Sequence, residues 1–465
     1  MINGFIDLPS QNCSCHFTLE DNIMTIYEEN SVPIDVSHKK LKFEIKSKRK
    51  YIIGRDIATN RNIIFFVNRE PFSDYFDDYF LASSDSIKVY FYITLFDDND
   101  NCLFNNMNFT CPELNYLFSI KRGNIINSEN NTFRLDTIPY ENIKKEFSFS
   151  IQKKNISSEF GIYIRREWNS PTPLKLQSVL NCAFDQTCDI DFVLNIYFTI
   201  KRLIRTLCYR NNINFDPIKL YITNSEGVTK KNGELHILFD NMSTIEESID
   251  ILKNTIEYSL LESHFSELVQ LIAEDRIYTK HIPRSKSESC NINISRAILC
   301  TAAFEWAFPQ VYDDITISKT SQKVQNDILS ILSDSTILNE YTSKYREKLK
   351  YYTDIIQKAN MNLSAKIVRA LNDNNDILAD YINHIYKLNR KVTDKYSIIA
   401  DNIQSQRNAF AHGNVEKELD DNYLLHITIL EWLIYSMIFK QAGYSTDEIF
   451  EIIKVIFNRN SITRY

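Results

Sequence analysis

The C-terminal part of the chain repeats its apolar residues at helical spacing over about 170 residues, which limits that part of the fold to packed helices. Gly443 followed by Ser445 and Glu448 marks a helix end and then a capping box, which defines the start of the last helix. The predicted helices cover residues 294–308, 321–333, 340–359, 364–386, 393–412, 422–441 and 446–457. An all-α domain over residues 286–465 is therefore expected.

Residues 1 to about 170 show a different pattern, of short aromatic and β-branched runs that often alternate with polar residues. Loops rich in Asn, Asp and Ser separate these runs. The clearest runs are KLKFEIKSK (40–48), YIIGRD (51–56), NIIFFVN (62–68), SIKVYFYITLF (86–96), KKEFSFSIQKK (144–154) and FGIYIRREW (160–168). We expect a β-sandwich or a strongly twisted sheet.

The middle of the chain mixes both patterns. It is helical from about Cys182 to Asn211 and again over residues 243–277. A hairpin is expected between these two stretches, from KLYIT (219–223) through a turn at Lys231-Asn232-Gly233 to ELHILF (234–239). The polar segment 281–293 makes a reasonable linker. The expected fold class is α+β, with a mainly-β domain carrying added helices over residues 1–285 before the all-α domain.

Composition excludes several classes of protein. The net charge of −7 has the wrong sign for a protein that coats nucleic acid non-specifically, although it leaves room for a local basic patch. With only 8 glycines and no Gly-rich phosphate loop, a nucleotide-cradling fold is not expected. The 9 cysteines lack the paired spacing of a zinc site, which favours reduced thiols. We expect neither a metal ion nor a cofactor.

Membrane attachment is not expected either. The N-terminus lacks the basic and apolar regions of a signal peptide. The most apolar helix candidate, residues 427–439, is too short to span a bilayer and contains Glu431. A soluble, cytoplasmic protein follows from these features.

Three polar residues stand together near the end of the helix predicted at 393–412. Arg407 and Asn408 are adjacent, and His412 lies one turn after Asn408. Thr393 is the expected N-cap and Gly413 the expected residue after the C-cap. The apolar stripe of this helix consists of Tyr396, Ile399, Ile403 and Phe410.

These side chains suit one kind of chemistry. The guanidinium of Arg407 can bind a phosphate or the charge that develops on it in a transition state. The imidazole of His412 can take up or release a proton near neutral pH. Cleavage of RNA by its own 2′-hydroxyl needs both functions and no metal ion. Asn408 would hold a phosphate or position His412.

A second Arg-x4-His sequence runs from Arg276 to His281. No polar residue follows its arginine, and Pro283 comes two residues after its histidine, at a probable domain joint. We interpret this copy as a coincidence.

The set at 407–412 resembles the signature of the HEPN superfamily: an arginine, then a polar residue, then a histidine four to six positions after the arginine. A mainly-β half joined to such a domain looks like the ApeA-like HEPN proteins of bacterial anti-phage defence. The resemblance implies a metal-independent endoribonuclease that leaves a 2′,3′-cyclic phosphate and a 5′-hydroxyl. It also implies a homodimer through the C-terminal helical domain, host tRNA or mRNA as substrate, and an N-terminal domain that responds to a phage-derived trigger.

Two further features have alternative interpretations. Glu305 is the one charged residue of AILCTAAFEWAF (297–308). It could lie beside Arg407 and orient the guanidinium or act in proton transfer, or it could form a structural ion pair between two helices, and these roles are not exclusive. The run YREKLKYY (345–352), with Lys344 and the downstream residues Lys366, Arg369, Lys387, Arg390, Lys391 and Lys395, either lines an RNA-binding surface or is a solvated helix face.

Two hypotheses of other classes remain open. Arg407 and His412 could be structural polar groups of a non-catalytic helical scaffold or sensor that binds RNA or protein. The acidic net charge favours that alternative slightly. The β half could also be a carbohydrate- or peptide-binding module, since it contains no chemical motif.

Overall fold

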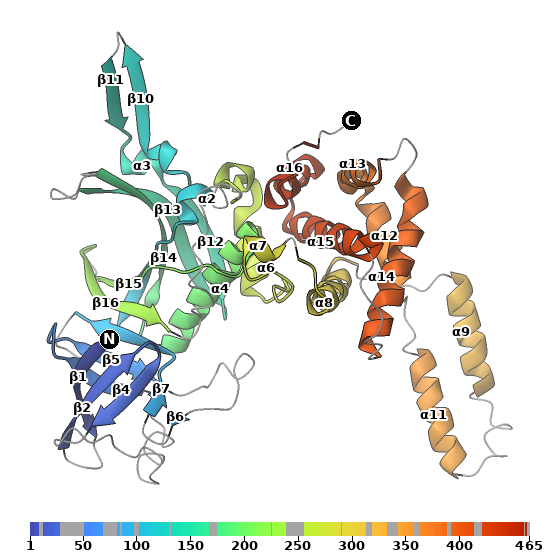
Figure 1. Cartoon of the computed structure of the whole chain (residues 1–465), viewed down its shortest axis with the longest axis horizontal. Helices are drawn as coiled ribbons and strands as arrows, with labels where there is room; N and C mark the ends of the chain where they lie inside the picture. Colours follow the sequence, from blue (N-terminus) through green and yellow to red (C-terminus); the bar gives the residue numbers. More distant parts are fainter. Residues whose placement is uncertain are drawn as a thin grey trace. The chain divides into compact units, whose positions relative to one another are not determined.

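The chain divides into two compact units, which are described separately. The first contains Met1–Glu274 and Ile282–Ser289, and the second contains Asp275–His281 and Cys290–Tyr465. The expected boundary at 285 falls where the chain alternates between the two units. The computed structural model (Figure 1) describes residues 1–8, 13–27, 51–67, 81–83, 86–96, 102–129, 132–166, 174–224, 226–238, 255–289, 291–312, 319–332, 343–357, 362–387, 392–412, 421–459 and 461–462.

In its described residues, the first unit is built on one 14-stranded sheet in which every neighbouring pair of strands is antiparallel. In sheet order the strands are β12 (Lys145–Ile151), β13 (Lys154–Arg166), β14 (Leu174–Thr187), β9 (Phe104–Phe109), β15 (Ile218–Thr223), β16 (Thr229–Ile237), β8 (Phe91–Leu95), β5 (Asn62–Phe66), β4 (Tyr51–Asp56), β1 (Ile2–Leu8), β2 (Cys13–Glu20), β3 (Ile23–Tyr27), β7 (Ser86–Lys88) and β6 (Leu81–Ser83). β10 (Asn124–Glu129) and β11 (Thr132–Thr137) form a separate hairpin. One hydrogen-bonded sheet therefore replaces the two sheets of a sandwich. The expected strand at 40–48 lies outside the described residues.

The N-terminal half of this sheet curls over itself. The rings of Phe17 on β2 and Phe65 on β5 lie 5.0 Å apart, although β1 and β4 stand between them in the sheet. Strands are spaced about 4.8 Å apart, so a flat sheet would separate these rings by roughly 14 Å. The curl encloses a buried apolar cluster of Ile6, Cys15, Phe17, Leu19, Met24, Ile26, Ile63, Phe65, Val67, Ile87 and Val89.

Two glycines on the intervening strands make room for the Phe17 ring. A Cβ at Gly4 would lie 2.5 Å from Phe17 Cε1 and closer still to the carbonyl oxygen of Arg55. A Cβ at Gly54 would lie 3.1 Å from the same ring atom. The curl therefore depends more strictly on Gly4 than on Gly54.

Gly4→Ala should destabilise the first unit by about 1–3 kcal/mol, because the new methyl group would overlap the Arg55 carbonyl oxygen and lie only 2.5 Å from the Phe17 ring. Gly54→Ala is the matched control and should cost less, since its contacts can relax by a few tenths of an ångström. Urea unfolding followed by far-UV circular dichroism measures both. Equal losses in the two variants would contradict the close approach at Gly4.

The two longest described helices of the first unit pack against each other in the other half. α4 (Ile190–Cys208) begins at Asp189, whose side chain accepts a hydrogen bond from the Phe192 amide, and it contacts β12 and α6 (Phe265–Ala273). The expectation of a helix from Cys182 was wrong, because residues 182–187 complete β14 and pair with β9. The expected helix at 243–277 is present only as α6 and short turns, and residues 239–254 lie outside the described residues.

The hairpin of β15 and β16 turns earlier than expected. Asn224 Oδ1 accepts the amides of Glu226 and Val228, at 3.1 and 2.8 Å, and Gly227 has a φ of +80°. The expected turn at Lys231–Gly233 is instead a bulge within β16, because Leu220 pairs with Gly233 and Tyr221 with Lys231. The Asn224 side chain, three positions before the glycine, can imitate a turn hydrogen bond and so decided where the hairpin turns.

The short segment expected as a linker is partly structured. Residues 282–289 belong to the first unit, where the amides of Asn211 and Asn212 donate to the carbonyls of Pro283 and Arg284. α7 (Lys286–Ser289) follows. These backbone bonds attach the segment to the end of α4.

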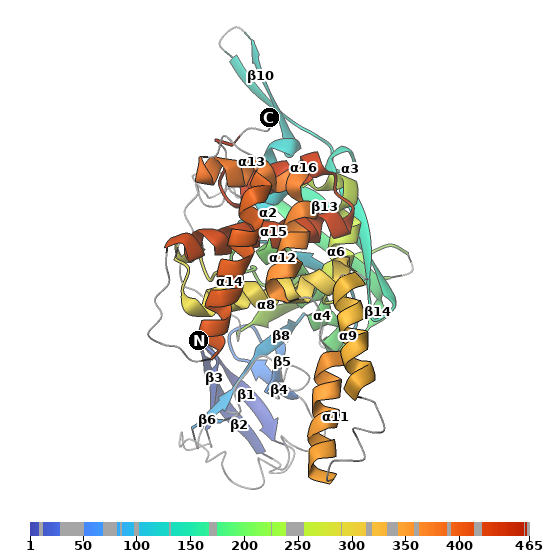
Figure 2. The ribbon, with the colours of Figure 1, turned by 90° about the vertical axis from the view of Figure 1, so that its right-hand side faces the viewer.

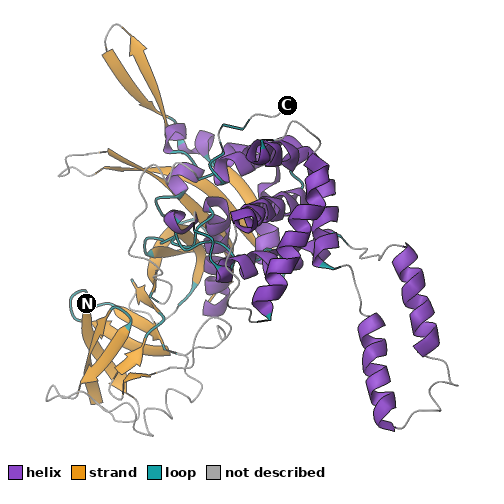
Figure 3. Ribbon diagram, turned by 45° about the vertical axis from the view of Figure 1, so that its right-hand side comes forward, coloured by secondary structure: helices purple, strands orange, loops and turns teal. Residues whose placement is uncertain are grey.

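The second unit is helical, as the periodicity predicts (Figures 2 and 3). Its longer helices are α8 (Ile294–Val311), α9 (Lys319–Leu332), α11 (Ser343–Gln357), α12 (Leu363–Asp373), α13 (Asn375–Tyr386), α14 (Tyr396–Ala411), α15 (Asp421–Ala442) and α16 (Thr446–Ile456). The capping box of Ser445 and Glu448 is confirmed. The predicted helix 364–386 is interrupted at Asn374, whose buried side chain donates to the Ala370 carbonyl. The α+β fold class is therefore correct.

α15 is the central helix of this unit and contacts α8, α13, α14 and α16. Apolar side chains surround it on all sides, as expected for a helix enclosed by others. Among the described residues, the stretch Asn422–Ala442 is the one helix long and apolar enough to cross a membrane, and most of it is buried within the unit. Such burial is typical of the core helix of a soluble protein.

Candidate functional site

α14 carries three of the four predicted site residues. Tyr396, Ile399 and Ile403 are buried along one stripe, as predicted, and Phe410 contacts the Tyr423 ring. A short 3₁₀ turn, η4 (Val392–Lys395), precedes the helix, so the predicted N-cap at Thr393 lies inside this turn. The expected role of Gly413 falls outside the described residues.

Glu305 and Arg407 form an ion pair between α8 and α14. Nη2 of Arg407 lies 3.5 Å from Oε2 of Glu305, and both side chains are 37% exposed. On α14, Arg407 stands one turn after the buried Ile403, at the edge of the packed stripe. The two helices contact each other, which brings together residues more than 100 positions apart in the chain.

Asn408 and His412 occupy the exposed side of the same helix end. Nη1 of Arg407 donates to Oδ1 of Asn408 at 3.4 Å. The amide of His412 donates to the carbonyl of Asn408, which places His412 at the helix C-cap. The His412 imidazole is exposed, and within the described residues it forms no hydrogen bond or ion pair with the other three side chains. The structure therefore joins Glu305, Arg407 and Asn408, and leaves the His412 ring exposed at the C-cap of the same helix.

This arrangement can bind an anion and exchange protons. Arginine has five N–H donors, and the contacts to Glu305 and Asn408 engage its two terminal nitrogens without enclosing the group. Partial exposure lets a phosphate reach the guanidinium. Pro309 lies one turn after Glu305 and has no amide hydrogen, so it offers no donor to the Glu305 carbonyl. The site is open and polar, and it faces solvent.

A second ion pair in this unit was not anticipated from the sequence. Nη2 of Arg296 on α8 lies 2.8 Å from Oε1 of Glu431 on α15, with side chains only 9% and 3% exposed. The thiol of Cys300 donates to the same oxygen at 3.2 Å, and burial raises the pKa of that thiol. The sequence feature that could have predicted this pair is Glu431 itself, because an acidic residue buried in an apolar helix requires a partner.

The two residues of the second Arg-x4-His sequence, Arg276 and His281, are part of the packed structure. Nε of Arg276 donates to Oε1 of Gln310, and the Arg276 carbonyl accepts from the Trp306 indole. His281 is buried, and burial together with the nearby Arg296 lowers its pKa to about 3. A buried neutral imidazole is a core residue, which agrees with our interpretation of this copy as a coincidence.

The buried His281 should make the second unit sensitive to acid. Its pKa in the folded protein is about 3, below the value of roughly 6.5 expected after unfolding. Its stabilising effect is therefore complete above about pH 6.5 and is lost as the pH falls toward 3, at about 1.4 kcal/mol per pH unit. Urea unfolding at pH 7.5, 6.0 and 5.0 should show a steeper loss for the wild type than for His281→Phe.

His384→Phe is the control for that experiment, because His384 is exposed on α13. It should lose stability with pH as the wild type does. Parallel curves for the wild type and His281→Phe would contradict a buried neutral His281.

His426 behaves as the satisfied core histidine that its position in an apolar helix suggests. Its ring nitrogens lie 2.6 Å from the Tyr386 hydroxyl and 2.9 Å from Asn402 Oδ1. Its side chain is buried. It therefore links α13, α14 and α15 and is not available for chemistry.

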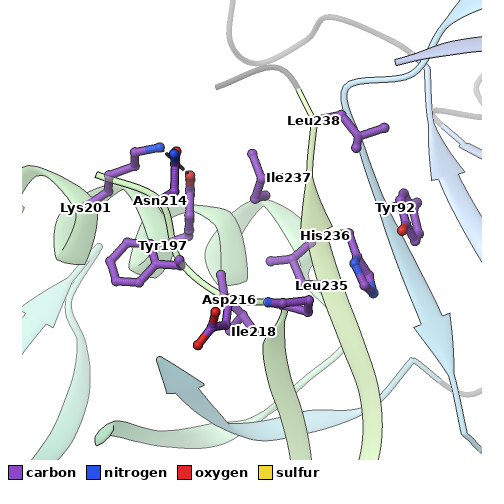
Figure 4. A pocket seen from close by; sticks show the side chains of 12 residues that line it. Tyr92, Tyr197, Lys201, Asn214, Asp216, Ile218, Leu235, His236, Ile237 and Leu238 are labelled. Atoms are coloured by element: carbon purple, nitrogen blue, oxygen red, sulfur yellow. Dashed lines mark hydrogen bonds between the residues drawn. The ribbon is translucent and has the colours of Figure 1, made fainter. Parts of the chain in front are cut away.

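The first unit contains a cavity of about 140 Å³ (Figure 4). Tyr197 and Lys201 of α4 line one side, and Nζ of Lys201 donates to the Tyr197 hydroxyl at 3.1 Å. Tyr92 and His236 also line it, with their rings stacked 4.4 Å apart. Burial lowers the pKa of His236. The volume is comparable to that of cavities that hold benzene-sized molecules.

Neither a metal site nor a known relative guides the assignment. In the parts of the chain that the structure describes, no group of three His, Cys, Asp or Glu side chains could hold a metal ion. No family model, curated protein or solved structure matches this chain.

Proposed function

We propose that the chain is a metal-independent endoribonuclease of the HEPN type, acting through the end of α14. The observation that carries the proposal is the placement of Arg407, which Glu305 and Asn408 orient at a partly exposed position near the end of the helix whose C-cap is the exposed His412. A guanidinium oriented by two side chains and an exposed imidazole at the same helix end would provide anion binding and proton transfer.

In the proposed reaction His412 removes the proton from the 2′-hydroxyl, and that oxygen attacks the adjacent phosphorus. The bond to the 5′-oxygen breaks, and this oxygen takes up a proton. The products are a 2′,3′-cyclic phosphate and a 5′-hydroxyl end. Arg407 neutralises the charge that develops on the phosphate, while Glu305 and Asn408 orient the guanidinium.

A homodimer through the C-terminal helical unit completes this proposal. Three apolar side chains on α8, the helix that carries Glu305, are partly exposed, namely Ile294, Ile298 and Trp306. Exposed apolar residues grouped along one helix are typical of interaction surfaces. A second copy on this face would bring two Arg407–His412 sets toward one substrate, as the resemblance to HEPN enzymes implies.

The cellular role follows from the same resemblance. The protein would act in the cytoplasm, without a cofactor, on host tRNA or mRNA as an ApeA-like anti-phage effector that ends infection together with the host cell. The first unit would bind the phage-derived trigger. Its cavity between α4 and β16 is a place where a small part of such a trigger could bind.

The test is cleavage of total cellular RNA by the purified protein in EDTA, with analysis of the product ends. The wild type should produce cyclic phosphate ends, and Arg407→Ala and His412→Ala should not. Cleavage that persists in both variants would remove this site from the reaction. A trigger is supplied by repeating the assay with lysate from phage-infected cells.

A non-catalytic scaffold or sensor is the second candidate. The ion pair of Arg407 with Glu305 favours it, since the guanidinium already has a protein partner. Under this alternative Glu305→Gln would alter stability and leave RNA intact in every assay.

A further inference from the structure

α9 and α11 contact each other as a pair of helices. Nε2 of Gln325 on α9 donates to the carbonyl of Ile356 on α11. The half-buried positions Leu329 and Leu332 on α9 and Leu349 on α11 recur at helical spacing, so they define the inner faces of the pair. The remaining faces of both helices are solvent-exposed where the structure describes their side chains.

The outer face of α11 carries three tyrosines. Tyr345, Tyr351 and Tyr352 are 63%, 62% and 53% exposed. The rings of Tyr351 and Tyr352 lie 5.6 Å apart, edge to face. Tyr345, Lys348 and Tyr352 fall on one side of the helix, one turn apart. Aromatic rings held in this way are unusual on a free surface, since aromatic residues are normally buried.

The pair of helices is basic within an acidic chain. It contains Lys319, Lys323, Lys344, Arg346, Lys348 and Lys350 against Asp327, Glu347 and Asp354, whereas the whole chain has a net charge of −7. The side chains of Lys323, Lys348 and Lys350 are exposed. Positive charge is therefore concentrated where the exposed rings are.

The lysines of α11 differ in their surroundings from Lys366, Arg369 and Lys395, which the sequence analysis placed on the same candidate RNA-binding surface. Lys366 and Arg369 lie over the rings of Phe308 and Tyr312, at 5.8 and 4.8 Å. Lys395 lies 5.9 Å from the Tyr386 ring. Those cations pack on the bundle, while the lysines of α11 stand among exposed tyrosines. Arg390 and Lys391 fall outside the described residues.

We propose that the α9–α11 pair is a binding surface for single-stranded RNA, which deepens the proposed function by assigning the element that holds the substrate. The tyrosines stack on unpaired bases, and Lys348, Lys350 and Lys323 contact phosphates. Stacking of this kind tolerates any base, because every base has an aromatic face. Tyr345 and Tyr352 are separated by about 10 Å along the helix axis, which spans about three stacked nucleotides.

Binding can be measured without cleavage by using a fluorescein-labelled, fully 2′-O-methylated 12-nucleotide RNA, which has no free 2′-hydroxyl to attack. Fluorescence anisotropy is recorded with the full chain in EDTA at several salt concentrations. The variants are Tyr345→Ala, Tyr351→Ala and Tyr352→Ala, singly and together, and the double variant Lys348→Glu/Lys350→Glu. Tyr51→Ala and Lys219→Glu/Lys230→Glu are matched controls at exposed positions of the first unit.

The triple tyrosine variant should bind at least tenfold more weakly, with little change in salt dependence. The lysine variant should also bind more weakly, and its plot of log affinity against log salt should be shallower than that of the wild type. Both controls should match the wild type. Circular dichroism confirms that each variant remains folded.

Unchanged RNA affinity in the tyrosine and lysine variants would overturn the proposal. So would a change in oligomeric state without a change in affinity, because the exposed Val324, Ile328 and Ile331 on α9 would then form a protein interface. The nuclease proposal is tested separately: binding of unmodified RNA without cleavage, both with and without lysate from phage-infected cells, would reject the nuclease and keep this surface.

Discussion

Replacing His412 with alanine should slow metal-independent RNA cleavage by at least about 10²-fold and by up to about 10⁴-fold. A positioned general acid or base contributes a factor of this size, and the exposed His412 imidazole is the group that the proposed reaction uses to remove the 2′-hydroxyl proton. The rate should be measured under single-turnover conditions in EDTA, with a labelled RNA whose cleavage sites have been mapped.

His384→Ala is the matched control, because His384 is also an exposed histidine near the end of a helix in the same unit. It should cleave at the wild-type rate. Arg407→Lys keeps the charge and loses the planar fork of donors, so it should recover only part of the activity lost in Arg407→Ala. Equal rates for His412→Ala and His384→Ala would show that His412 takes no part in the reaction.

Glu431→Ala should destabilise the second unit by about 3–5 kcal/mol. The substitution leaves the buried Arg296 guanidinium without its partner carboxylate and removes the acceptor of the Cys300 thiol. Glu305→Ala should cost less than about 1 kcal/mol, because the pair with Arg407 is partly exposed and screened by water. The two ion pairs thus differ in role despite joining similar helices.

Urea unfolding followed by circular dichroism at 222 nm measures this difference. Because a chain of two units need not unfold in one step, the transition of the helical unit should be compared between the variants. Arg296→Met/Glu431→Leu should regain most of the lost stability, since it removes both charges together. A similar small loss in Glu431→Ala and Glu305→Ala would contradict the burial of the Arg296–Glu431 pair.

Most helices of the second unit could be predicted from patterns of residues close together in the sequence. The capping box at Ser445, the stripe of Tyr396, Ile399 and Ile403, and the ends of α15 and α16 follow from residues within one or two turns of each other. The main error was to predict one helix over residues 364–386, which the structure divides at Asn374. The buried side chain of this asparagine forms a hydrogen bond to the backbone of its own helix, and the spacing of apolar residues gives no sign of such a bond. The polar set of Arg407, Asn408 and His412 was equally local, so it could be found in advance.

The sequence alone determined that the C-terminal part is helical, that the N-terminal part is rich in strands, and which polar residues end α14. Only the tertiary structure decided the order of the 14 strands, the meeting of Glu305 with Arg407, and the partnership of Arg296 with Glu431. It also decided that Lys366 and Arg369 pack on rings while the α11 lysines remain exposed. The physical reason is range: helical hydrogen bonds join residues four positions apart, whereas strand pairing and ion pairs between helices join residues that packing alone brings together.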